Sequence, residues 1–174
     1  MRRADLVAEC SRCSALCCVA TSFDESEAFA FAKAAGTPCP QLGPDHRCRI
    51  HEQLVERGCA GCHVYDCYGA GPRATRAFDD VPVATRDAAF LALRDIHELI
   101  WLLSESIKLC PEIEMALRGE LARAIDQLET LAASPAAALI ELPLASRATE
   151  VHALLRRVGA ALGGRQHHAL RVIG

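Results

Sequence analysis

The sequence predicts a mainly α-helical protein, in which an irregular cysteine-rich metal-binding head precedes a bundle of three or four helices. Three observations lead to this prediction. Nine of the ten cysteines fall within the first 67 residues. Turn-forming stretches such as "GTPCP" and "GAGPR" interrupt that same region. Beyond about residue 80, apolar residues recur instead at the helical spacings of three and four.

The head, residues 1–76, opens with the stretch "ECSRCSALCC". On a helix Cys10, Cys13 and Cys17 would share one face, and Cys18 would point about 100° away. Two later stretches, "CPQLGPDHRC" and "CAGCHVYDC", supply further thiols and a second C-x-x-C pair. A turn that carries C-x-x-C is a recurrent half-site for zinc, and iron–sulfur clusters also bind through thiolates. The spacing therefore predicts a metal site and leaves zinc or an iron–sulfur cluster open.

Disulfides are the alternative use of these thiols. They persist in oxidising compartments, whereas "MRRADLVAECSRC" lacks the apolar run of a secretory signal. Nine is also an odd number, so a purely disulfide framework would leave one thiol unpaired. We expect a cytoplasmic protein that binds metal.

Charge and hydropathy exclude two classes of partner. A formal net charge of -3 provides no positive field for nucleic-acid phosphates. The most apolar stretch, residues 88–103, contains Arg94, Asp95, His97 and Glu98, which a membrane span would exclude. We expect neither a nucleic-acid partner nor a membrane.

Residues 22–36, "SFDESEAFAFAKAAG", have two interpretations. Ser22 with Glu25 resembles a capping box and Gly36 a helix stop, which favours a helix. The alternation in "AFAFAK" favours a short strand.

The second part, residues 77–164, is predicted to be the helical bundle, followed by a tail at 165–174. Thr85 is a candidate cap for the first helix, and Pro111 ends that helix and begins the next. Ser134 and Pro135 introduce a short helix that ends before Pro143. The last helix is expected to end at Gly163-Gly164. The apolar stripe of the first helix is formed by Phe90, Leu93, Ile96, Ile100, Leu103 and Ile107.

Several other residues are open to two interpretations. Cys59 is either an additional ligand or a bystander thiol. His46, His51 and His63 could bind metal through imidazole nitrogen, although isolated histidines are more often solvated or hydrogen-bonded. Cys110 is expected to be a small buried hydrophobic residue. His97 and Trp101 are expected to pack the bundle and not to catalyse a reaction.

The spacing of "CSRCSALCC" and "CPQL…HRCRIHEQLVERGCAGCHVYDC" resembles the bacterial family of zinc- or iron-chelating cysteine-cluster domains. That family has C-x-x-C followed by a CC pair, a C-P-x-L segment, a C-x-I-[YH] segment and a final pair of cysteines. The resemblance implies eight metal ligands: Cys10, Cys13, Cys17, Cys18, Cys39, Cys48, Cys62 and Cys67. The family's usual Arg-Pro is replaced here by "HEQLVERGC". Flagellin lysine methylases share a related cluster.

"LCCVATSFDESEAFAFAKAAGTPCPQL" and "VYDCYGAG" are more closely similar to the leader region of certain bacterial pentapeptide-repeat proteins. The likeness extends through "LRDIHELIWLLSESI" to about residue 160. No tandem series of A-[DN]-L-x-x repeats occurs before the final "GRQHHALRVIG". The resemblance therefore does not imply the DNA-mimic role that is associated with those repeats.

These observations predict a metal-binding, non-enzymatic adaptor that meets a protein partner or a second copy through its helical half. The alternative is an iron–sulfur enzyme of the methyl- or electron-transfer type, as the methylase resemblance suggests. No catalytic residues are assigned under the first hypothesis.

Overall fold

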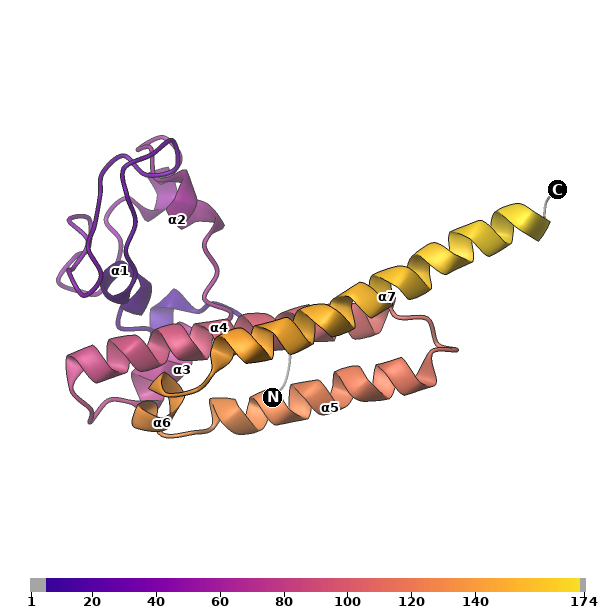
Figure 1. Ribbon diagram of the computed structural model, residues 1–174. Helices are drawn as coiled ribbons and strands as arrows, with labels where there is room; N and C mark the ends of the chain where they lie inside the picture. Colours follow the sequence, from indigo (N-terminus) through magenta and orange to yellow (C-terminus); the bar gives the residue numbers. More distant parts are fainter. Residues whose placement is uncertain (1–5, 173–174) are drawn as a thin grey trace.

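The computed structural model describes the chain from residue 6 to residue 172, with side chains described for residues 6–163. It is mainly helical, as the sequence predicted. Within the described residues no strand forms, and extended backbone pairs only in three isolated β-bridges. Three long helices run beside one another in Figure 1: α4 (Val83–Leu109), α5 (Met115–Ala132) and α7 (Leu144–Val172). The short α6 (Ala136–Ile140) connects α5 to α7.

α4 is the central helix of the bundle. Its apolar residues follow the predicted spacing, and Phe90, Leu93 and Leu103 are completely buried. Both α5 and α7 pack against it, so its stripe is covered on more than one side. The helix ends at Cys110, whose N–H still bonds to the oxygen of Ser106 before the chain turns at Pro111. The predicted stop at this proline is confirmed.

Three predicted helix boundaries are wrong. Thr85 does not cap the first helix, because α4 already begins at Val83 after Pro82. The second helix does not begin at Pro111: residues 111–114 form a turn, with the N–H of Glu114 bonded to Pro111, and α5 begins at Met115. The last helix does not end at Gly163-Gly164. A glycine ends a helix by taking a left-handed conformation, and Gly163 does not have a positive φ. α7 therefore continues through the predicted tail to Val172.

The head consists of loops and very short helices. Its elements are η2 (Cys10–Arg12), α1 (Leu16–Ala20), η3 (His51–Gln53), α2 (Ala60–Val64) and α3 (Ala70–Ala77). Residues 22–36 form no helix. They fold back through the antiparallel bridges Phe23–Lys33 and Ser26–Phe29, so the helix interpretation is wrong. The sequence did not predict α3, because "GAGPR" resembles a turn.

The base of the head belongs to the same hydrophobic core as the bundle. Leu16 and Ala20 of α1, with Ala70 and Ala74 of α3, are buried together with the stripe of α4. In Figure 1 the remaining head segments, in indigo and purple, stand to one side of α4, away from α5. The thiols are thus carried by loops above a helical base.

Among the described residues, no helix combines the length and the apolar composition that crossing a membrane requires.

Candidate metal centre

The eight cysteines predicted as ligands come from five separate segments of the head. Cys10 is the first residue of the turn η2 and Cys13 follows its end, while Cys17 and Cys18 lie in α1. The loop before η3 carries Cys39 and Cys48; Cys62 is in α2, and Cys67 precedes α3. Each of the ten cysteines in the described part of the chain is free, so no disulfide joins them.

The first cluster is not one continuous helix. η2 ends at Arg12, and Ala15 then takes a left-handed conformation with φ 59 before α1 begins. Cys10, Cys13 and Cys17 therefore do not share one helix face, which corrects the expectation from their spacing. The break separates a C-x-x-C turn from the adjacent pair Cys17 and Cys18.

Backbone N–H groups point at three of the sulfurs. The N–H of Gln41 lies 3.4 Å from Cys39 Sγ. The N–H of Ile50 donates to Cys48, and those of Gly69 and Gly71 donate to Cys67. Burial raises the pKa of all three thiols, and these hydrogen bonds act in the opposite direction. A hydrogen bond to sulfur favours the thiolate, which is the form that binds metal. These turns therefore present their thiols in the manner required of a ligand.

Gly71, in the first turn of α3, lies against two thiols from different segments. A Cβ at this position would lie 2.8 Å from Cys13 Sγ and 3.6 Å from Cys67 Sγ. The hydroxyl of Thr75, one turn later on α3, is 3.8 Å from Cys13 Sγ. Cys13 and Cys67 therefore converge on one side of α3, at a place where a larger residue would intrude between them.

The thiols oppose one another's ionisation. Burial raises the pKa of Cys62 to about 11, with further contributions from the charges of Cys59, Cys18, Cys39 and Cys48. The pKa of Cys17 is raised because its thiol donates a hydrogen bond to Cys18. That hydrogen bond lowers the pKa of Cys18 to about 7, although burial opposes it. A bound cation would offset this repulsion and favour the thiolates together.

A buried lysine adjoins the cysteines. Lys33 is 6% exposed, and its ammonium group faces the backbone oxygens of Val19, Thr21, Ala34 and Thr37. Burial lowers the pKa of Lys33, while the charges of Cys39, Cys18 and Cys17 act in the opposite direction. Its positive charge is therefore held beside the thiols. The only feature of the sequence that points to Lys33 is its position at the end of the apolar run "AFAFAK".

Two tyrosines and an arginine lie next to these thiols. Burial raises the pKa of Tyr65, and the charges of Cys17 and Cys67 raise it further. The guanidinium of Arg94, on α4, lies 6.0 Å from the ring centroid of Tyr65 and 5.7 Å from that of Tyr68. Tyr65 remains 36% exposed, so one side of the cysteine group adjoins the protein surface.

The remaining candidates lie in different surroundings. Cys59 is buried, and its thiol lies 3.7 Å from the oxygen of Arg57. Cys110 is buried in the bundle, as predicted. The side chains of His46, His51 and His63 are exposed. Within residues 6–163, no three His, Cys, Asp or Glu side chains lie in an arrangement that would hold a metal ion. Thiols are donors that zinc and iron prefer, but the described residues do not bring three of them together.

Comparison with known proteins gives one relative. The chain is 30% identical over 172 residues to YybG, an uncharacterized protein of Bacillus subtilis (strain 168), and the match covers 94% of this chain. The chain spans 61% of the length of that relative. No protein-family model matches the chain. No solved structure matches it at a significant level.

Proposed function

We propose that this protein binds zinc or an iron–sulfur cluster through the thiols of its head, and that its helices present the head to a protein partner or to a second copy of the chain. The observation that carries the proposal is the set of backbone N–H groups directed at Cys39, Cys48 and Cys67. Such donors serve thiolates and are not needed by inert buried thiols. Free thiols of this kind also suit a cytoplasmic location.

The metal would have a structural role. Between α1 and α2 the backbone makes only isolated bridges, η3 and single turns. A segment of this kind has little regular hydrogen bonding to stabilise it. In small modules structural zinc contributes apparent binding free energies of about 10–16 kcal/mol. Metal binding would thus stabilise loops whose own packing gives them only marginal stability. This role agrees with the resemblance to chelating cysteine-cluster domains and to pentapeptide-repeat leaders.

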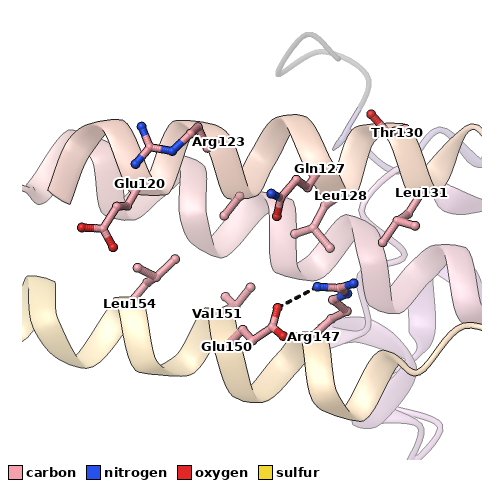
Figure 2. Close-up of a pocket in the computed structure, with 11 residues that line it drawn as sticks. Glu120, Arg123, Gln127, Leu128, Thr130, Leu131, Arg147, Glu150, Val151 and Leu154 are labelled. Carbon is pink, nitrogen blue, oxygen red and sulfur yellow. Dashed lines mark hydrogen bonds and ion pairs between the residues drawn. The ribbon is translucent and has the colours of Figure 1, made fainter. Parts of the chain in front are cut away.

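A groove between α5 and α7 supports the docking part of the proposal. Figure 2 shows apolar Leu128, Val151 and Leu154 along its floor, with charged side chains at its edges. The edges carry both signs: Arg147 pairs with Glu150 at 2.9 Å. An apolar floor with mixed charges along its edges suits an amphipathic helix of a protein partner or of a second copy.

One observation favours the second candidate function, methyl or electron transfer at an iron–sulfur cluster. Tyr65 and Arg94 border the thiols where they approach the surface, so a small substrate or a redox partner could reach them there. Activity of this type requires a metal with an exchangeable coordination position.

The test is elemental analysis of protein purified without added metal and without oxygen. We expect zinc or iron at a substantial fraction of one equivalent per chain, and brown colour would identify an iron–sulfur cluster. Protein that contains neither metal and takes up neither on reconstitution would refute the proposal. Sedimentation of the same sample, with Leu154→Glu as the groove variant, tests association through the helices.

A further inference from the structure

Two thiols from distant parts of the chain lie against the first turn of α3. A Cβ at Gly71 would lie 2.8 Å from Cys13 Sγ and 3.6 Å from Cys67 Sγ. The two sulfurs are therefore no farther apart than the sum of these distances, although one thiol precedes α1 and the other follows α2. The fold thus brings a pair of thiols to one residue of a helix.

Thr75, on α3, holds the segment that carries Cys13. Its hydroxyl accepts the N–H of Ser14 at 3.0 Å and lies 3.8 Å from Cys13 Sγ. α3 in turn is anchored in the core shared with α4 through Ala70 and Ala74, which are both completely buried. The position of Cys13 is therefore fixed relative to α3.

Cys67 is held by the beginning of the same helix. Its sulfur accepts hydrogen bonds from the N–H groups of Gly69 and Gly71. Its carbonyl oxygen accepts the N–H of Ala70 at 2.9 Å. Because both thiols are held by α3, little chain entropy remains to be lost when their sulfurs meet.

Gly71 leaves room for that approach. Its φ is not positive, so the backbone at this position does not require glycine. Glycine in a helix is unfavourable relative to alanine, but here it omits a side chain that would touch both sulfurs. The space in front of Gly71 is where either sulfur can turn toward the other.

Other pairs of thiols are less suited to forming a bond. Cys17 and Cys18 are adjacent in α1. Consecutive Cα atoms are about 3.8 Å apart, whereas a disulfide spans a Cα separation of about 4.4–6.8 Å. Cys10, three residues before Cys13, is exposed and does not approach Gly71 as closely as Cys13 and Cys67 do.

We propose that Cys13 and Cys67 form a reversible disulfide that fastens the head to α3, with a low-molecular-weight disulfide as the oxidant. One protein thiolate attacks the small disulfide, breaks its S–S bond, releases one small thiolate and leaves a mixed disulfide. The second protein thiolate attacks the protein sulfur of that mixed disulfide and releases the other small thiolate. Two protein thiols are oxidised, the small disulfide is reduced to two thiols, and these take up the two protons that the protein gives up.

The site is open to such an oxidant and shares its sulfurs with the predicted metal ligands. Cys13 and Cys67 are half-buried, and Tyr65, beside Cys67, is 36% exposed. In reducing compartments disulfides of this kind are transient and respond to redox conditions. The bond would withdraw two thiolates from a metal, so oxidation would release it. That release rests on the proposed function, whereas the disulfide itself does not.

Oxidation of the full chain as purified tests the pair. The protein is incubated with glutathione disulfide, the remaining thiols are alkylated with N-ethylmaleimide, and the denatured chain is digested with trypsin. Cleavage at Arg12 and Lys33 releases residues 13–33, and cleavage at Arg57 and Arg73 releases residues 58–73. We expect mass spectrometry to find these two peptides joined, and a reductant to separate them.

Substitutions assign the bond, because each of the two peptides carries three cysteines. Cys13→Ser and Cys67→Ser should each abolish the joined peptide. Cys18→Ser and Cys62→Ser are matched controls on the same peptides and should retain it. A joined peptide that survives Cys67→Ser, or a wild-type bond from Cys13 to Cys10, would overturn the proposal.

Metal released into a chromophoric chelator is followed during the same oxidation. We expect it to rise in proportion to the joined peptide. A joined peptide in protein that contains no metal would support the disulfide and refute the proposed function. Metal-containing protein whose two peptides stay separate, both as purified and after a chelator has removed the metal, would overturn the disulfide and leave metal binding intact.

Discussion

The Nδ1 atom of His97, completely buried in α4, lies 2.7 Å from the backbone oxygen of Tyr68, the residue that follows Cys67. Because a carbonyl can only accept, Nδ1 carries the proton and Nε2 is left as an acceptor. Arg73 of α3 places Nη1 3.3 Å from that Nε2, and its Nη2 donates to the oxygen of Ala132 at the end of α5. One histidine thus connects the loop that carries Cys67 to three helices.

We predict that His97→Ala lowers the free energy of unfolding by about 1–3 kcal/mol, because it leaves a buried carbonyl without its donor. His97→Asn is the matched control, since its side-chain amide retains a donor near the position of Nδ1. Urea denaturation followed by circular dichroism measures both variants. Equal loss of stability in the two would show that the volume of His97 matters more than its hydrogen bond to Tyr68.

Lys33 gives a prediction for metal affinity. Lys33→Met keeps the length of the side chain, but removes the charge beside Cys18 and Cys39 and the donor that faces four backbone oxygens. We expect metal affinity to fall by roughly tenfold or more, which corresponds to about 1.4 kcal/mol. Competition with a chelator of known affinity measures it.

The chain has one other lysine, Lys108, which serves as the control. It lies on the surface of α4 and pairs with Glu105, so Lys108→Met should leave metal affinity unchanged. If the two variants bind metal equally well, the charge of Lys33 has no influence on the thiols.

Gly71 tests the approach of Cys13 and Cys67 to α3. In Gly71→Ala the new methyl carbon would lie 2.8 Å from Cys13 Sγ, which is shorter than a van der Waals contact allows. We expect a loss of about 1–3 kcal/mol of stability from the displaced thiol, together with lower metal content. Gly159→Ala, on α7, meets nothing within 4 Å and should stabilise the protein by about 0.5–1 kcal/mol. The unfolding temperatures and metal contents of both variants test whether Cys13 and Cys67 lie this close to α3.

Asp87 gives a pH-dependent prediction. It is buried in α4, its Oδ1 makes no hydrogen bond in the described residues, and burial raises its pKa against the lowering effect of Arg86 and Lys33. A carboxyl with a raised pKa is more stable in the fold when protonated, so it contributes stability at low pH and loses it as pH rises through the folded pKa. Asp87→Asn should therefore be more stable than the wild type at pH 7.

That advantage of Asp87→Asn should shrink as pH falls toward the ordinary range of a carboxyl. Comparing the two unfolding temperatures at each pH cancels any effect of acid on the thiols that both variants share. A difference that is constant from pH 7 to pH 4 would contradict the raised pKa.

Helical periodicity predicted the bundle well because burial on one face imposes a period that the sequence must follow. The stripe of α4 from Phe90 to Leu103 and the buried Cys110 were both found this way. Helix ends were predicted less well, since Pro111 and Gly163 are each compatible with more than one backbone conformation. The grouping of thiols depends on contacts between distant segments, such as Cys39 with Cys18. Spacing along the chain cannot show which thiols such contacts bring together.

Metal removal should loosen the head before the bundle. The loops between α1 and α2 have little regular backbone pairing, whereas α3 shares the core with α4. Trypsin has exposed sites in these loops at Arg47, Arg49 and Arg57. Arg47 donates hydrogen bonds to the oxygens of Cys10 and Ser11, which hold that site in the folded head. We therefore expect a chelator to accelerate cleavage at the head sites severalfold.

The bundle supplies the internal control for this experiment. Arg123 and Arg156 are also exposed, but they lie within α5 and α7, where cleavage requires the helix to open locally. Their cleavage rates should not change when metal is removed, and the helical signal in circular dichroism should largely persist. Cleavage that accelerates equally at Arg47 and Arg123 would mean that head and bundle unfold as one unit. Cleavage that accelerates at neither site would mean that the head holds its fold without metal, and would remove the structural role proposed for the metal.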